Sequence, residues 1–346
     1  MRINKKAIFN AVFLIVVFAL TIYGVFHGED MDALLSAMKK ADIRWLIPGV
    51  LLVTFFIWGE SIIIWYMMRS FGVKLKKRIC FLFSSVGFFF SCITPSATGG
   101  QPMQIYFMKK EKIPIPFATV ILMVVTITYK LVLVVIGLGV VFFAQGFMKR
   151  YLMNILPVFY LGIGLNVFCV AFMTILVFHP VLMEGILQKI LDWLEKLHIC
   201  KKNRKRRTRF HHSMDVYRDT AAYLKEHKLL ICNVIFITFA QRIALFAVTW
   251  MVYLAFGLSG ASAWDIILLQ AVISVSVDML PLPGGMGISE SLFLKIFKPV
   301  FAALTLPAMV LSRGLGYYSQ LLISAAFTVV AQLYYTWKDS DSNAGG

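Results

Sequence analysis

Six ionisable side chains fall inside long apolar stretches of the sequence or at the ends of such stretches. An ionised side chain at the centre of a membrane-spanning helix costs roughly 2.5–3.5 kcal/mol, so it persists where it pairs with another charge or lines a polar cavity. Three of the six are acidic and three are basic, which permits structural ion pairs, but such pairs stabilise poorly compared with apolar packing. The pattern therefore favours a polar cavity. The six residues are Glu60, Lys130, Arg242, Asp278, Glu290 and Arg313.

A glycine-rich segment late in the chain has the composition of a ligand-binding turn. It contains Pro283, Gly284, Gly285, Gly287 and Glu290. Glycines let the backbone approach a ligand closely, and the N–H groups at a helix start attract anions such as phosphate. Glu290 would fall in the first helical turn, where it could hold a cationic headgroup, an arginine or a proton. A tight turn between two half-helices explains the same residues equally well.

The first half of the chain carries a related segment with hydroxyls and amides in place of charge. These polar side chains suit phosphate or glycerol oxygens as hydrogen-bonding partners. The segment includes Pro95, Gly99, Gly100 and Gln101, together with Thr94, Ser96, Thr98 and Gln104.

The sequence shows no motif for catalysis. It has no nucleophile–base pair, no phosphate-binding loop of the Walker type and no zinc-ligand spacing. The five cysteines also lack metal-ligand spacing and are typical of buried free thiols. We therefore expect no catalytic residues, no metal site and no cofactor, and enzymatic chemistry is unsupported.

Composition places these residues in a membrane protein. The chain has 346 residues, of which 60% are apolar and 15% are charged, so it is too apolar for a water-soluble domain of this size. The first apolar run follows a basic start but lacks a signal-peptide cleavage site, so we expect a retained helix. Six runs are long enough to cross a membrane: 7–26, 45–68, 117–144, 153–178, 229–256 and 304–335.

Two further apolar runs, 79–93 and 266–280, are too short to span, and each ends in one of the two Pro/Gly segments. A helix broken at membrane depth is typical of a re-entrant segment, which here would cover 79–101 and 266–290. The expected fold is therefore all-α and polytopic, with about six full spans and two re-entrant broken helices. The alternative is eight ordinary spans with Pro/Gly-rich ends.

The basic residues predict the topology. The net charge of +17 comes mostly from residues between apolar runs, as the positive-inside rule requires. This distribution places both termini in the cytoplasm and lets the two broken segments enter from opposite faces. Such an arrangement indicates an inverted repeat with a binding site near the midplane, as in secondary transporters.

One sizeable polar region, 181–228, separates the two halves. Its first part has the spacing of an amphipathic surface helix, and a basic run follows at 201–207. That run attracts anionic headgroups or serves only as an orientation signal, and the sequence does not choose between the two. We expect residues 1–337 to form one membrane domain and residues 338–346 to form a disordered tail.

The two Pro/Gly segments resemble those of the lysylphosphatidylglycerol synthase transmembrane-domain family. This is the flippase-like part of the multiple peptide resistance factor, and it also occurs as stand-alone membrane proteins. The resemblance extends from the first helix to Trp337, and its second motif is the more specific. The matching positions are Pro95, Gly99, Gly100 and Gln101 in the first motif and Pro283, Gly284, Gly285, Gly287 and Glu290 in the second.

The resemblance implies translocation of a phospholipid across a bacterial plasma membrane, and a link to cationic peptide resistance. Full-length members add a cytoplasmic domain that aminoacylates phosphatidylglycerol from charged tRNA, which we do not expect in this chain. The implied partners are membrane lipids, anionic or aminoacylated, with no direct nucleic-acid contact. One alternative is the membrane part of a phosphatidylglycerol lysyltransferase system that acts with a separate soluble transferase. Another is a non-transporting lipid-binding scaffold, and homo-oligomerisation stays open.

Overall fold

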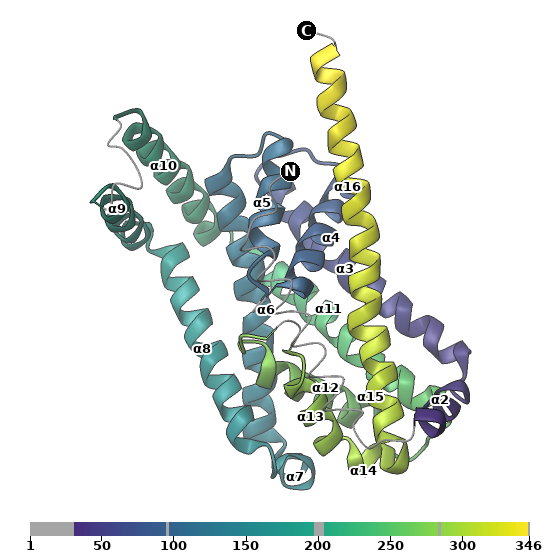
Figure 1. Ribbon diagram of the computed structural model, residues 1–346. Helices are drawn as coiled ribbons and strands as arrows, with labels where there is room; N and C mark the ends of the chain where they lie inside the picture. The colour runs from purple at the N-terminus through teal and green to yellow at the C-terminus, as the bar shows by residue number, and fades with distance from the viewer. Residues whose placement is uncertain (1–30, 95–96, 197–203, 283–284, 345–346) are drawn as a thin grey trace.

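The computed structural model describes residues 31–94, 97–196, 204–282 and 285–344, and these residues are helical with no strand among them (Figure 1). Five helical stretches are long and apolar enough to cross a membrane, and one shorter apolar helix, α12 (Ala263–Val277), accompanies them. The five are α3 (Ile43–Ser70), α6 (Ile115–Phe143), α8 (Leu156–Phe178), α11 (Lys228–Ala255) and the stretch Lys298–Lys338. They confirm five predicted spans, whereas the predicted span 7–26 lies outside the described residues.

The last stretch is made of several helices. Helices α14 (Lys298–Phe301), α15 (Thr305–Arg313) and α16 (Ser319–Ala344) follow one another, separated by a 3₁₀ turn and a π-helical turn. Helix α16 continues to Ala344, so it includes most of the tail that the sequence predicted to be disordered. Extending an existing helix costs little compared with starting one, which lets polar residues continue it.

Contacts between loops and helix ends define two ends of the helical bundle. At the first end, Tyr223 Oη donates to the Ser70 carbonyl oxygen at 2.7 Å, and Lys338 Nζ lies 2.9 Å from Glu111 Oε1. At the second end, the Asp42 amide donates to the Ala255 carbonyl oxygen at 2.8 Å. The long helices connect these two ends.

In each of two pairs of shorter helices, the chain starts and finishes at the same end of the bundle, and the two pairs use opposite ends. Helix α4 (Lys77–Ile93) starts at the first end, breaks at residues 94–99 and is followed by α5 (Gly100–Lys110), which returns to that end. Helix α12 starts at the second end, breaks at residues 278–287 and is followed by α13 (Ile288–Ile296), which returns there. Figure 1 shows the two pairs toward opposite ends of the bundle.

At the first break, Thr94 caps the backbone with its side chain and Gly100 allows the two helices to pack closely. Thr94 Oγ1 donates to the Phe90 carbonyl oxygen at 2.6 Å and accepts from the Gly99 amide at 2.9 Å. A Cβ atom at Gly100 would lie 2.1 Å from Ser91 Oγ and 2.7 Å from the Gly87 carbonyl oxygen. The return helix therefore packs against α4 at a distance that only glycine permits.

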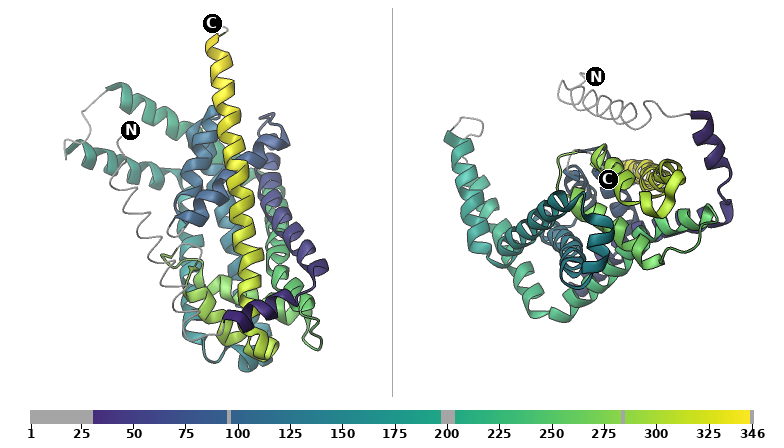
Figure 2. Two further views of the ribbon diagram at one scale, coloured as in Figure 1. Left: turned by 45° about the vertical axis from the view of Figure 1, so that its right-hand side comes forward. Right: turned by 90° about the horizontal axis from the view of Figure 1, so that it is seen from below.

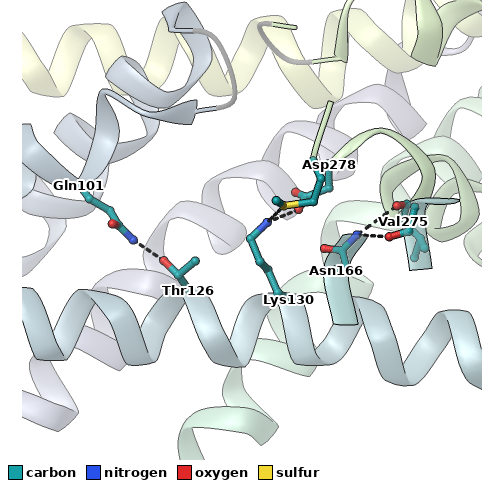
Figure 3. Close-up of polar contacts among 8 residues, drawn as sticks. Gln101, Thr126, Lys130, Asn166, Val275 and Asp278 are labelled. Carbon is teal, nitrogen blue, oxygen red and sulfur yellow. Dashed lines mark hydrogen bonds and ion pairs between the residues drawn. The ribbon is translucent and has the colours of Figure 1, made fainter. Parts of the chain in front are cut away.

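The C-terminal end of α12 packs against α8 through another glycine. A Cβ atom at Gly162 would lie 2.4 Å from the Val275 carbonyl oxygen. Asn166, one turn later in α8, donates from Nδ2 to that same oxygen at 3.2 Å and to the Gly162 carbonyl oxygen at 2.9 Å (Figure 3). Because the last carbonyls of a helix lack partners within it, this amide supplies one to the broken helix.

Helices α9 (Pro180–Lys196) and α10 (Arg204–Glu226) extend sideways from the first end of the bundle (Figure 2). Helix α9 covers the first part of the polar region and exposes apolar side chains, including Ile186, Ile190 and Trp193. Arg207 joins the two helices through ion pairs with Asp192 at 2.7 Å and Glu195 at 2.8 Å. This pair of helices is therefore a polar extension with one exposed apolar stripe.

The contact between α8 and α12 predicts different effects for two nearby glycines. Gly162→Ala should lower the free energy of unfolding by about 1–3 kcal/mol, because the new methyl group meets backbone atoms that cannot move aside easily. Gly164→Ala should be neutral or stabilising, because nothing lies within 4 Å of its Cβ position and alanine is about 1 kcal/mol better than glycine in a helix. Thermal unfolding of both variants in one detergent tests this. Equal effects would contradict the proposed close packing.

Candidate binding cavity

A cavity of about 630 Å³ lies between the two helix breaks. Thr98 and Gln101 line it from the first break, and Asp278 and Gly285 line it from the second. Helices α3, α4, α6, α8, α11 and α12 supply further walls through side chains such as Met173 of α8, and Tyr317 and Gln320 also line the cavity. The two motifs that the sequence singled out, more than 170 residues apart in the chain, therefore face one common space.

Helix α6 contacts both breaks from one face. Gln101 Nε2 donates to Thr126 Oγ1 (Figure 3). One turn later, Lys130 Nζ lies 2.5 Å from Asp278 Oδ2 and 2.9 Å from Met279 Sδ. Residues four apart lie on the same side of a helix, so Thr126 and Lys130 present successive anchors, one for each break.

Glu60 of α3 lines the cavity and is held by an amide. Gln104 Nε2 of α5 donates to Glu60 Oε1 at 2.7 Å. Gly87 of α4 makes room for that amide, because a Cβ atom there would lie 2.3 Å from Gln104 Nε2. Helices α3, α4 and α5 thus together fix the position of one carboxylate.

Arg242 of α11 is stacked between aromatic rings. Its Cζ atom lies 3.4 Å from the centroid of the Tyr129 ring and 4.8 Å from that of Phe56. Its Nε is buried, and no acceptor within the described part of the chain binds it. Lys130 Nζ lies 5.4 Å from the same Tyr129 centroid, so the two cations of the cavity share one ring.

Glu290 and Arg313 form a second ion pair beside this cavity. Arg313 Nε donates to Glu290 Oε1 at 2.7 Å, while Oε2 accepts from the Gly287 amide at 2.7 Å and from Ser289 Oγ at 2.9 Å. Gly287 has a φ of +83°, a conformation that glycine adopts without strain. The carboxylate of Glu290 therefore occupies the N-terminus of α13, where the sequence also allowed an external anion. The geometry matches the structural ion pair that was left open there.

A smaller cavity of about 160 Å³ adjoins the larger one. Arg313 and Ser289 line it, and it shares Ser274, Val277 and Tyr317 with the larger cavity. The second ion pair therefore borders the cavity system without filling it.

The site residues predicted from the sequence lie in three parts of the structure: the larger cavity, the smaller cavity with its ion pair, and the backbone of the breaks. Six line the larger cavity: Glu60, Gln101, Lys130, Arg242, Asp278 and Gly285. Arg313 lines the smaller cavity, Glu290 pairs with it, and Gly99, Gly100 and Gly287 shape the backbone of the breaks. Pro95, Pro283 and Gly284 lie outside the described residues.

Several residues that line the larger cavity were not predicted from the sequence. They are Thr126, Tyr129, Tyr317 and Gln320. Polar positions four apart in the run 117–144, with Tyr129 directly before Lys130, were the available signal for the first two. Across the part of the chain that the structure describes, no group of His, Cys, Asp and Glu is placed to hold a metal ion.

Comparison with known families gives one match. The model of the lysylphosphatidylglycerol synthase TM region matches residues 8–324, which is most of the chain. A comparison with curated proteins returned no match.

The ion pair between α6 and the second break predicts strong coupling between its two residues. Lys130→Met leaves a buried carboxylate without its cation and should lower the free energy of unfolding by about 3–5 kcal/mol. Adding Asp278→Leu should restore part of that loss, because the orphaned charge is gone. A double-mutant cycle from unfolding curves should give a coupling energy above about 1 kcal/mol. Strictly additive effects would show that the two side chains do not interact.

Proposed function

The chain belongs to the lysylphosphatidylglycerol synthase transmembrane-region family, and from that premise we propose that it binds a phospholipid and translocates it through the cavity between its two helix breaks. The observation that carries this proposal is the set of side chains around that cavity. Both breaks and four ionisable residues, Glu60, Lys130, Arg242 and Asp278, line one space of about 630 Å³. A scaffold that only packs helices has no use for such a space, because Glu60 and Arg242 have no direct ion-pair partner within the described residues and such charges are costly in an apolar bundle.

The two broken pairs act as re-entrant segments of an inverted repeat in this proposal. Helices α4 and α5 start and finish at the first end, and α12 and α13 start and finish at the second. In secondary transporters, broken helices of an inverted repeat form the binding site near the midplane, and one repeat moves against the other to alternate access. The headgroup would pass between the breaks while the acyl chains stay in the surrounding lipid.

The first end faces the cytoplasm in this proposal. Lys74, Lys76, Lys109 and Lys110 lie in its loops or helix ends, and the basic helix α10 extends from it. The second end carries fewer basic residues, among them Lys149 and Arg150, and its loop 257–262 carries none. The exposed apolar stripe of α9 also lies at the first end and suits the boundary between headgroups and acyl chains. Together these features agree with the positive-inside rule.

Thiol labelling tests this orientation. Cysteines introduced at Lys110 and Arg206 should react only with a reagent supplied from the cytoplasm, because both positions lie at the first end. A cysteine at Ser259, in the loop 257–262, should react only from outside. The labelling is measured in intact cells with a membrane-impermeant maleimide, after the native cysteines are replaced. External reaction at Lys110 would remove the re-entrant segment and the inverted repeat.

Translocation itself is tested by filling the cavity. Leu245 of α11 lines both cavities, so Leu245→Trp should lower phospholipid translocation in reconstituted vesicles to the rate of protein-free vesicles. The cost of overpacking should stay within about 1–3 kcal/mol, so the variant should remain folded. Phe236→Trp is the matched control on the same helix, since Phe236 is 73% exposed. Normal translocation by a folded Leu245→Trp variant would exclude the cavity as the path.

A further inference from the structure

We propose that the cavity selects a zwitterionic headgroup, whose phosphate binds Arg242 and whose primary ammonium binds Glu60. This inference rests on the proposed function and specifies its substrate class. The chemistry is that of an ethanolamine phosphate, with one anionic and one cationic group a few bonds apart.

Arg242 lies on the wall of the cavity and requires an anion as its partner. The Tyr129 ring lies 3.4 Å from its Cζ atom, so the face of the guanidinium is stacked while its N–H edge remains available. Its buried Nε has no acceptor within the described residues. Arg242 also lines the cavity, and no carboxylate within the described residues forms a direct ion pair with it. A phosphate oxygen in the cavity would therefore accept charge-assisted hydrogen bonds from the terminal N–H groups of the guanidinium.

Glu60 lies on the wall of the cavity and requires a cation as its partner. It receives a neutral amide donor from Gln104 at 2.7 Å, but no cation within the described residues forms a direct ion pair with it. Its electrostatic partner is Arg242, which does not reach it directly. A headgroup ammonium between the breaks would neutralise this carboxylate.

Packing between α3 and α11 keeps these two charged residues on adjoining walls. Gln241, the residue before Arg242, donates from Nε2 to the Phe56 carbonyl oxygen at 2.8 Å. A Cβ atom at Gly59, the residue before Glu60, would lie 2.9 Å from Gln241 Cγ. Glu60 and Arg242 follow these contacting residues and line the same cavity, and no direct ion pair joins them.

The remaining two charges neutralise each other. Lys130 and Asp278 form a direct ion pair at 2.5 Å, so neither needs a ligand. The four lining charges are two acids and two bases, and their formal sum is zero. An electrically neutral ligand with separated charges therefore fits the cavity, while a net anionic headgroup would satisfy Arg242 and leave Glu60 unpaired. A headgroup with an additional ammonium would bring a cation for which no carboxylate remains.

Equilibrium binding of three lipids to the purified full-length protein tests this selection. The probes are phosphatidylethanolamine, phosphatidylglycerol and lysylphosphatidylglycerol, each titrated into the protein in detergent and counted by native mass spectrometry. We expect phosphatidylethanolamine to bind about tenfold more tightly than either other lipid, the difference that one charged hydrogen bond makes. Equal or tighter binding of phosphatidylglycerol or lysylphosphatidylglycerol would overturn the proposal.

Two variants assign the two ends of the headgroup. Glu60→Gln keeps an acceptor for Gln104 but removes the charge, so it should weaken phosphatidylethanolamine about tenfold and leave phosphatidylglycerol unchanged. Arg242→Gln should weaken both lipids. The matched controls are Glu226→Gln and Arg44→Gln, which remove the same charges from exposed positions. Unchanged selectivity in Glu60→Gln, with thermal stability retained, would also overturn the proposal.

Two additional experiments distinguish a lipid ligand from a soluble one, and the selection of a headgroup from its translocation. Soluble glycerophosphoethanolamine should compete weakly, because it lacks acyl chains; competition as strong as that of the lipid would identify a soluble ligand and contradict a lipid one. Translocation of both lipids without preference in vesicles would refute this selection and leave the proposed function standing. Selective binding without any translocation would refute the proposed function and leave the selection standing.

Discussion

The constraint on which the rest of the structure depends is the interruption of two helices inside an apolar bundle. A helix that stops at membrane depth exposes backbone N–H and C=O groups that lipid cannot solvate. In this chain the partners come from protein. Thr94 caps the first break from its own side chain, and Asn166 of α8 reaches the Val275 carbonyl oxygen near the second. Glu290 caps the N-terminus of α13 by accepting a hydrogen bond from the Gly287 amide.

Those partners also shape the cavity. Because Lys130 is tied to Asp278 and Glu290 to Arg313, the ends of the second break are held by charges that are already satisfied. The first break is held by neutral amides, with Gln101 on Thr126 and Gln104 on Glu60. Arg242 is thereby the charged residue of the larger cavity that retains a buried donor without an acceptor within the described structure. The support of the breaks and the polarity of the cavity follow from the same contacts.

Much of this arrangement could be predicted from the sequence, because its signals are local. Hydropathy indicated the five spans within the described residues, and the Pro/Gly segments indicated both breaks. The cost of buried charge singled out all six ionisable residues. The pairing of Lys130 with Asp278 could not be predicted, because the two residues are 148 residues apart and meet only through helix packing. Glu290 could be placed in a first helical turn but not shown to cap it, because that depends on the φ of Gly287 and on Arg313.

The central claim is that a phospholipid headgroup passes between the two breaks, and tethering the breaks to each other tests it most directly. Pro102 and Leu282 line the cavity from opposite breaks, so each can be replaced by cysteine in a chain whose native cysteines are removed. A bifunctional thiol reagent with a cleavable disulfide would then join them across the space. Phospholipid translocation in reconstituted vesicles should stop when the tether forms and resume when a reductant cleaves it. Translocation that continues at the untethered rate after complete cross-linking would contradict the claim.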